Sequence, residues 1–299
     1  MAEADPALRF QAARPMLLGL AYRILGSRAD AEDAVQDTFL KWQTNERGDI
    51  VNAEAWLTTA CTRHCLDLLK AADRARVDYV GTWLPEPVQT AGDAEGDDDP
   101  SRSAALALSL TTAFLLALQR LTPKERAAYL LHEIFDRPYP EVAATLELQE
   151  PACRQLVTRA RQHIAHERVR HDTPPARQRR LLDAFREAIN TGSTTVLATL
   201  LSDDVRLSAD GGGRVSATRR VMRGPGEVLR FIEAGLHVWW SPEALVEVPL
   251  NGEPGFIVRD GDGVTATVSF AWNDAGQLQD VFIMRNPDKL THVGGPAIH

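Results

Sequence analysis

Cysteine is scarce in this sequence. Three cysteines among 299 residues are few and odd in number, which argues against the disulfide framework of a small secreted domain. Residues 1–5 (MAEAD) are acidic and contain no apolar core, so the start of the chain does not predict a signal peptide. Both absences favour a cytoplasmic protein.

Long apolar runs are also missing. The longest stretch without a charged residue is Ser103–Gln119, which is bounded by Arg102 and Arg120. It is shorter than the ~20 apolar residues that a membrane-spanning helix needs, and it contains hydroxyl and amide side chains. We therefore expect a buried or amphipathic helix in this stretch.

An excess of positive charge is missing as well. The 33 Lys and Arg residues against 41 Asp and Glu residues give a net charge of −8, so bulk charge disfavours non-specific binding to nucleic acid. Any contact with DNA must come from a local basic surface. Residues 151–180 supply one, because they contain eight arginines and only two acidic residues.

The length is about twice that of a typical domain, which predicts two or three modules. Residues 8–78 and 103–172 have helical patterns without strand-like alternation. Between them, residues 79–102 contain prolines and then a run of acidic residues, which predicts a linker. Residues 176–292 form a third block with a different pattern.

The third block predicts a few helices against a mostly antiparallel sheet, which is an α+β domain. The helical segments are Ala176–Asn190, Thr194–Leu201 and about Pro225–Val238. The strand-like runs, most of them separated by glycine-rich turns, are Val205–Leu207, Ala244–Leu250, Phe256–Arg259, Val264–Trp272 and Leu278–Arg285.

The first block contains an acidic amphipathic helix over residues 30–42. Ala34, Thr38 and Trp42 recur every four residues on its inward side, while Asp33 and Asp37 form a row elsewhere on its surface. Taken alone, these residues favour an ordinary solvated face with acids near the helix N-terminus.

The next segment, Asn52–Arg76, predicts a basic helix. Arg63, Lys70 and Arg74 recur at seven and four residues and share a face. Cations beside an aromatic residue such as Trp56 suit single-stranded nucleic acid, whose phosphates pair with the cations while its bases stack. The signal is weak by itself.

The second block predicts a helix-turn-helix. Thr122 and Glu125 form a capping box with Pro123 in the first turn, and a short helix over residues 140–146 follows. The helix that begins at Glu150-Pro151 has an apolar side, formed by Cys153, Leu156, Val157, Ala160 and Ile164. Its other side presents Arg, Gln and Thr, as a DNA recognition helix does; the alternative is a solvated basic helix.

Together, the two helical blocks resemble bacterial sigma-70 factors of the extracytoplasmic-function (ECF) group. The resemblance covers about 150 residues in the order that the family shows. It is carried by AYRILG at 21–26, DAEDAVQD at 30–37, the segment 52–76, ERA at 125–127, EVA at 141–143 and CRQLVTRAR at 153–161.

The resemblance implies that core RNA polymerase and promoter DNA are the partners, with contacts to the β′ clamp helices and the β flap. Polymerase would carry the catalysis, so we expect no enzyme activity and no cofactor. The implied polymerase-binding residues are Asp30, Glu32, Asp33, Gln36, Asp37, Phe39 and Leu40. The implied −10 residues are Trp56, Arg63, Asp67, Lys70, Arg74 and Arg76, and the implied −35 residues are Arg154, Gln155, Thr158, Arg159 and Arg161.

Three further motifs are similar to those of an ECF subgroup with a fused C-terminal SnoaL-like domain, a cone-shaped α+β fold related to ketosteroid isomerases. They are Trp83, Leu84, Pro85, Glu86 and Pro87; Asp210, Gly211, Gly212, Gly213 and Arg214; and Asn286, Pro287, Asp288, Lys289 and Leu290. Arg214 departs from the pattern, in which Lys is commoner.

The resemblance implies that the fused domain regulates in cis, in place of a separate anti-sigma protein. We expect Trp83 and its apolar neighbours to insert against the cone, and Asp210, Arg214, Asp288 and Lys289 to fix the arrangement. Read singly, the glycine motif is also an ordinary turn, and Asn286-Pro287 is also an ordinary strand terminator.

A different function stays open for the third block, which could be a small-ligand sensor or an isomerase-like enzyme with an Asp general base in an apolar cavity. The polar candidates are Asp204, Asp210, His237 and Arg285, and the cavity candidates are Trp239, Trp240, Phe270 and Trp272. A zinc site at Cys61, His64 and Cys65 lacks a fourth ligand, so we expect no metal.

Overall fold

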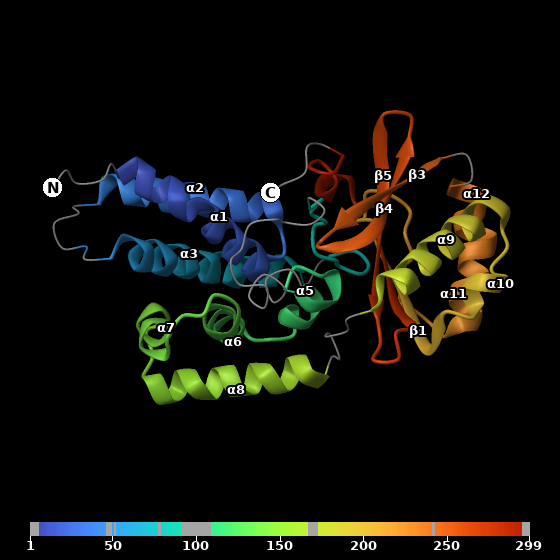
Figure 1. Ribbon diagram of the computed structural model, residues 1–299. Helices are drawn as coiled ribbons and strands as arrows, with labels where there is room; N and C mark the ends of the chain where they lie inside the picture. Colours follow the sequence, from blue (N-terminus) through green and yellow to red (C-terminus); the bar gives the residue numbers. More distant parts are fainter. Residues whose placement is uncertain are drawn as a thin grey trace. The chain divides into compact units, whose positions relative to one another are not determined.

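The computed structural model describes residues 6–45, 50, 52–76, 79–90, 109–166, 173–240 and 243–294 (Figure 1). The side chains of residues 72–76 and 166 are not described. The chain divides into two compact units, and each is treated by itself. We call residues 1–78 with 117–166 the helical unit, and residues 79–116 with 167–299 the C-terminal unit.

The helical unit begins with three helices: α1 (Pro6–Leu25), α2 (Arg28–Thr44) and α3 (Ala53–Arg76). Ser27 caps α2, since its side chain accepts a hydrogen bond from the amide of Asp30. The stripe predicted for α2 is buried, and Trp42 at its end is 2 % exposed. The indole of Trp42 donates to the carbonyl of Pro6, 2.9 Å away.

Helix α5 (Thr112–Gln119) spans the boundary between the two units, and the helical unit continues with α6 (Pro123–Tyr129), the π-helix η2 (Leu130–Ile134), α7 (Tyr139–Leu146) and α8 (Glu150–His166). Both hydrogen bonds of the predicted capping box at Thr122 and Glu125 are present. Residues 103–108 of the expected helix lie outside the described residues; residues 109–110 form a turn, and α5 begins at Thr112. None of the described helices is long and apolar enough to cross a membrane.

The two helical blocks, which the sequence separates, pack together in one unit. The guanidinium of Arg126 is buried and links them, because it donates to the carbonyl of Leu118 over 2.9 Å and to that of Ile24 over 2.6 Å. The hydroxyls of Thr59 and Thr145 add a second bridge between the blocks, with 2.9 Å between their oxygens. The side chain of Arg126, on α6, thus supplies hydrogen bonds to buried carbonyl groups near the ends of α1 and α5, which have no partner within their own helices.

The C-terminal unit contains a six-stranded sheet in the order β2-β1-β6-β5-β4-β3. All neighbouring pairs are antiparallel except β1 with β6, which is parallel. The α+β prediction for this block is confirmed. The strands are β1 (Leu201–Asp210), β2 (Met222–Arg223), β3 (Ala244–Leu250), β4 (Glu253–Asp260), β5 (Gly263–Trp272) and β6 (Leu278–Met284).

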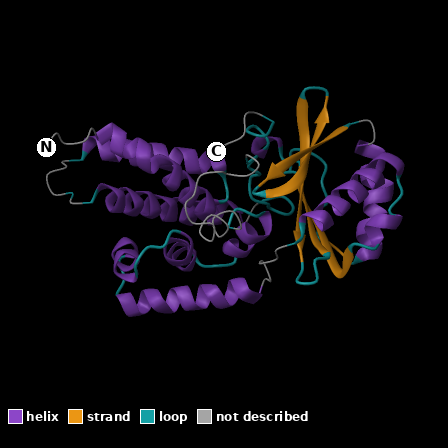
Figure 2. Cartoon of the chain, viewed as in Figure 1, coloured by secondary structure: helices purple, strands orange, loops and turns teal. Residues whose placement is uncertain are grey.

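Helices cover one face of this sheet, as Figure 2 shows. They are α9 (Pro175–Thr191), α10 (Thr195–Ala198), α11 (Pro225–Phe231), the π-helix η3 (Ile232–Leu236) and α12 (His237–Trp240). Alternate strand residues point to each face, so Val205, Leu207 and Ala209 of β1 enter the core under the helices. Their neighbours Ser208 and Asp210 point to the opposite face.

Candidate functional sites

The segment 79–90, which we call the strap, lies in an extended conformation on the sheet face opposite the helices. It contains no helix, as its prolines predict. Leu84 is 2 % exposed and joins a second apolar cluster on this face. The other buried members of that cluster are Ile257, Phe282, Met284, Leu290 and Val293.

Asp210, at the end of β1, is the polar centre of the strap site and is fully buried. One carboxylate oxygen accepts from the Tyr79 hydroxyl (2.6 Å) and the Gly212 amide (2.9 Å). The other accepts from the Leu84 amide (2.9 Å) and the Lys289 ammonium (2.8 Å). Four donors, one of them the Lys289 ammonium, thus offset the cost of burying this carboxylate.

Lys289 completes the charge balance of the strap site. Its ammonium also donates to the carbonyl of Leu84 (2.7 Å) and lies 4.4 Å from the ring centroid of Trp83. Burial raises the pKa of Tyr79 above its ordinary value near 10, and the adjacent Asp210 raises it further. The Tyr79 phenol therefore stays protonated and donates to Asp210.

The glycine motif is required by close contacts at this site. Gly212 has a φ of +59°, and a Cβ there would lie 2.3 Å from the side-chain nitrogen (Nδ2) of Asn286. That amide donates to the Tyr79 oxygen (3.1 Å). A side chain at position 212 would therefore displace Asn286 and disturb the phenol that binds Asp210.

The end of the strap pairs with the turn between β3 and β4. The amide of Thr90 donates to the carbonyl of Pro249 (3.1 Å), and the amide of Asn251 donates to the carbonyl of Val88 (2.7 Å). The Val88 amide donates in turn to the side chain of Asn251 (3.2 Å). These bonds hold the end of the strap to β3 and to the turn that follows it.

The structure brings most of the predicted motif residues together, but it separates one pair. Arg214 and Asp288 form an ion pair with each other (3.1 Å), and none of the hydrogen bonds seen between described residues joins either side chain to the strap. Both side chains are more than 60 % exposed, so this pair contributes little. Sequence reasoning missed Tyr79 and Asn251, because neither belongs to a motif.

The residues proposed for an enzyme or sensor cavity do not converge. Asp210 serves the strap, while Trp240 and Phe270 lie in the core under the helices. Trp239 is 53 % exposed. The remaining polar candidates bind elsewhere: His237 to the carbonyl of Ile189, Arg285 to that of Ser216, and Asp204 to the side chain of Gln279. Trp272 also lies in the core.

The acidic surface of α2 is presented largely as predicted. The exposed members are Asp30, Asp33, Gln36, Asp37 and Leu40. Glu32 is half-buried in an ion pair with Arg28 (2.9 Å), and Phe39 is half-buried against Phe10, with ring centroids 4.7 Å apart.

His64 of α3 lies 3.0 Å from a carboxylate oxygen of Asp37. Cys61 and Cys65 are buried. Among the described residues, no group of three His, Cys, Asp or Glu side chains could hold a metal ion.

The residues expected to contact the −10 element lie on α3. Trp56 is half-buried against Trp42, with ring centroids 5.4 Å apart, and Lys70 pairs with Asp67 (2.8 Å). The side chains of Arg74 and Arg76 lie outside the described residues.

Arg63 of α3 contacts the carboxyl end of α7. Its guanidinium donates to the carbonyls of Ala144 and Thr145 (2.9 Å each) and lies 3.0 Å from the carboxylate of Glu147. A cation at a helix C-terminus satisfies open carbonyls and complements the helix dipole.

Helix α8 presents the predicted recognition face. Cys153, Val157, Ala160 and Ile164 are buried, whereas Arg154, Gln155, Thr158, Arg159 and Arg161 are exposed. Three acidic side chains hold the arginines: Glu150 binds Arg154, Glu125 binds Arg159, and Glu133 binds Arg161. The guanidinium of Arg154 also lies over the ring of Tyr139, 4.2 Å from its centroid.

Comparison with known proteins places these helices in a family. The description "Sigma-70 region 2" matches residues 9–75, and "Sigma-70, region 4" matches residues 111–164. The chain is 35 % identical over 293 residues to "ECF RNA polymerase sigma factor SigJ" of Mycobacterium tuberculosis, covering 94 % of this chain and 92 % of SigJ. This chain is an ECF sigma factor.

Two further likenesses extend over the whole sigma factor. "Probable ECF RNA polymerase sigma factor SigI" of Mycobacterium tuberculosis is 31 % identical, with 97 % of each chain covered. The crystal structure of SigJ superposes with a TM-score of 0.76 at 32 % identity, covering 96 % of this chain and 99 % of SigJ. The likeness therefore includes the C-terminal unit, and the chain functions in promoter-directed initiation of transcription.

Proposed function

We propose that this sigma factor docks on the clamp helices and the flap of core RNA polymerase in the cytoplasm, and that its C-terminal unit acts in cis where other family members use a separate anti-sigma protein. The helical unit would supply the docking and promoter contacts, through α2, α3 and α8. The observation that carries the cis proposal is the bonding of the strap to Asp210 and Lys289.

The strap links the C-terminal unit to the connection between the two DNA-reading blocks. That connection joins α3, which ends at Arg76, to α5, which begins at Thr112. Because residues 79–90 are bonded to the sheet, fewer residues of the connection are left to adjust the distance between the two DNA-reading blocks. Because two linked readers bind together only when their connection matches the distance between their sites, the strap would set which promoter spacings are used.

The cis proposal is tested by transcription from a set of promoters that differ in the distance between the −35 and −10 elements. The test protein is the full chain with the substitution Lys289→Gln, which removes the ammonium group that binds Asp210 and the carbonyl of Leu84. Arg214→Gln is the matched control, since it removes a cation from an exposed pair on the same unit. We expect K289Q to change the preferred spacing or the output and R214Q to match the wild type; equal profiles for all three proteins would refute cis regulation.

The docking proposal is tested separately with charge reversal on α2. Asp33→Arg with Asp37→Arg should abolish binding to core polymerase, because both carboxylates are exposed on one row of the helix. Asp203→Arg with Asp204→Arg makes the same change of charge on the C-terminal unit and should bind like the wild type. Wild-type affinity of the α2 variant in a pull-down with core polymerase would contradict the proposed docking face.

A further inference from the structure

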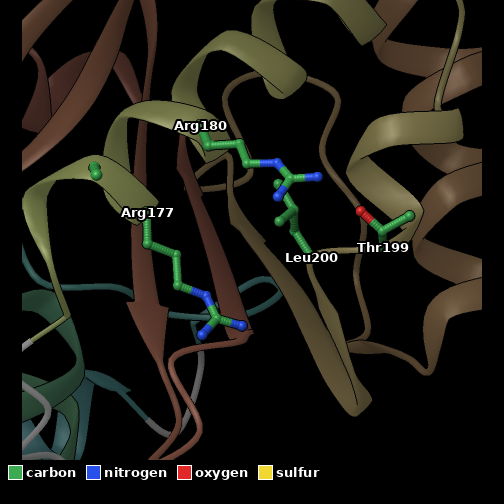
Figure 3. Close-up of a pocket in the computed structure, with 5 residues that line it drawn as sticks. Arg177, Arg180, Thr199 and Leu200 are labelled. Atoms are coloured by element: carbon green, nitrogen blue, oxygen red, sulfur yellow. The ribbon is translucent and has the colours of Figure 1, made fainter.

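The C-terminal unit has a pocket beside the start of α9, which Figure 3 shows with its lining residues. Ala176, Arg177 and Arg180 come from α9, and Thr199 and Leu200 come from the segment that leads into β1. Its volume is about 610 Å³, which lies within the range of small-molecule sites. The Arg180 side chain extends from α9 toward Leu200 and Thr199.

The two pocket arginines differ from the other arginines of the same helix. Arg179 and Arg186 both bind the carboxylate of Glu247, at 2.8 Å and 3.2 Å. In the part of the chain that the structure describes, no acidic side chain pairs with Arg177 or Arg180. Among the described residues, the two positive charges of the pocket therefore have no acidic side chain that neutralises them.

Arg177 and Arg180 lie near the N-terminus of α9, where binding of an anion is favourable. The first turn of α9 contains no acidic residue, and cations near a helix N-terminus are disfavoured by the helix dipole. Arg177 is also accommodated by the turn between β5 and β6: a Cβ at Gly276 would lie 3.1 Å from a guanidinium nitrogen of Arg177. The glycine leaves room for this cation beside the pocket.

We propose that this pocket binds a small organic anion, whose carboxylate or phosphate group pairs with Arg180 while Arg177, beside Gly276, adds positive charge to the pocket wall. A guanidinium matches both anionic groups because its N–H donors form a planar fork. Leu200 and Ala176, the apolar residues of the lining, contact an apolar body that the anionic group carries.

The proposal is tested on the full chain by isothermal titration with four probes: phenyl phosphate, benzoate, inorganic phosphate and uncharged benzyl alcohol. We expect saturable binding of phenyl phosphate or benzoate, and at least tenfold weaker binding of inorganic phosphate and of benzyl alcohol. The phenyl phosphate and benzoate arms distinguish the two anionic groups. Absence of saturable binding by both aromatic anions would overturn the proposal.

The variant Arg177→Gln with Arg180→Gln should weaken binding of the preferred anion at least tenfold. Arg219→Gln with Arg230→Gln is the matched control, because it removes two cations from exposed positions of the same unit and should change affinity less than twofold. Equal affinities of both double variants would overturn the proposal. So would loss of promoter-duplex binding by the pocket variant with unchanged anion binding, which would assign these arginines to DNA. Polymerase is absent from these assays, so their outcome is independent of the proposed function.

Discussion

The carboxylate of Asp210 accepts a hydrogen bond from the backbone amide of Leu84, which lies 126 residues earlier in the chain, over 2.9 Å. The same carboxylate accepts from Lys289, whose ammonium binds the carbonyl of Leu84. An aspartate and a lysine thus satisfy both backbone groups of one strap residue. Asp210 is a structural anchor, and its place in the strap site accounts for its burial.

Replacing this anchor should release the strap. Asp210→Ala leaves the half-buried Lys289 without its anionic partner, so the free energy of local opening should fall by about 3 kcal/mol. Hydrogen exchange at the Val88 amide, which donates to Asn251 and not to Asp210, measures this change, and about 3 kcal/mol corresponds to a roughly 100-fold faster exchange. Asp288→Asn, in the exposed pair with Arg214, should change the same exchange by less than about 1 kcal/mol; similar effects of the two substitutions would contradict this assignment.

Tyr79 should make the stability of the C-terminal unit depend on alkaline pH. Because the folded pKa of Tyr79 lies above the unfolded value near 10, its contribution is complete below about pH 10. That contribution is lost as the pH rises from there through the folded pKa. Tyr79→Phe should therefore lower the free energy of unfolding by about 1–2 kcal/mol at pH 8.

The measurement is a pair of urea titrations of the wild type and the Tyr79→Phe variant at pH 8 and above pH 10. The difference between the two proteins should shrink at the higher pH, since only the wild type has the phenol to titrate. A difference that stays constant between the two pH values would show that the Tyr79 proton is not coupled to folding.

Arg63 should stabilise the contact between α3 and α7. Arg63→Ala removes its hydrogen bonds to the carbonyls of Ala144 and Thr145, and we expect a loss of about 1–2 kcal/mol in urea unfolding followed by the helical circular dichroism signal. Lys70→Ala is the control from the same helix, because Lys70 makes only an exposed pair with Asp67, worth under about 0.5 kcal/mol. Equal losses would show that the contact with α7 contributes nothing.

Arg154 should read a base and not only a phosphate. Arg154→Ala is expected to weaken binding to the −35 element by about 1–3 kcal/mol and to relax its sequence preference. Arg154→Lys keeps the charge but loses the fork that Glu150 and Tyr139 orient, so its sequence preference should relax as well. A lysine variant with wild-type preference in a binding assay on substituted −35 sequences would reduce Arg154 to a phosphate contact.

The sequence predicted those parts of the fold that depend on local signals. The capping box at Thr122 and Glu125 and the helical recurrence of Cys153 and Val157 act over three or four residues, and both occur in the structure. The segment that ends at Leu201 was predicted as helix, but β1 begins there. Leu201 pairs with Leu278 of β6, and such distant pairing overrides local propensity.

Contacts between distant segments were predicted only in part. The resemblance grouped the motifs around Asp210 and Lys289 but included Arg214 and Asp288, which pair with each other on the surface. Nothing periodic in the sequence marks the bond from Tyr79 to Asp210. The sequence shows Arg177 and Arg180 only as members of a basic segment. The fold shows that Glu247 pairs with the neighbouring Arg179 and Arg186.

The central position of β6 constrains how the protein is made. This last strand lies between β1 and β5, and Lys289, which binds Leu84, is synthesised 205 residues after it. During translation, the strap therefore leaves the ribosome long before its binding site exists, and contacts so distant in sequence form late in folding. A premature stop codon before residue 278 would remove the middle of the sheet and not its edge, which leaves the nascent chain with exposed apolar surface for proteases to recognise.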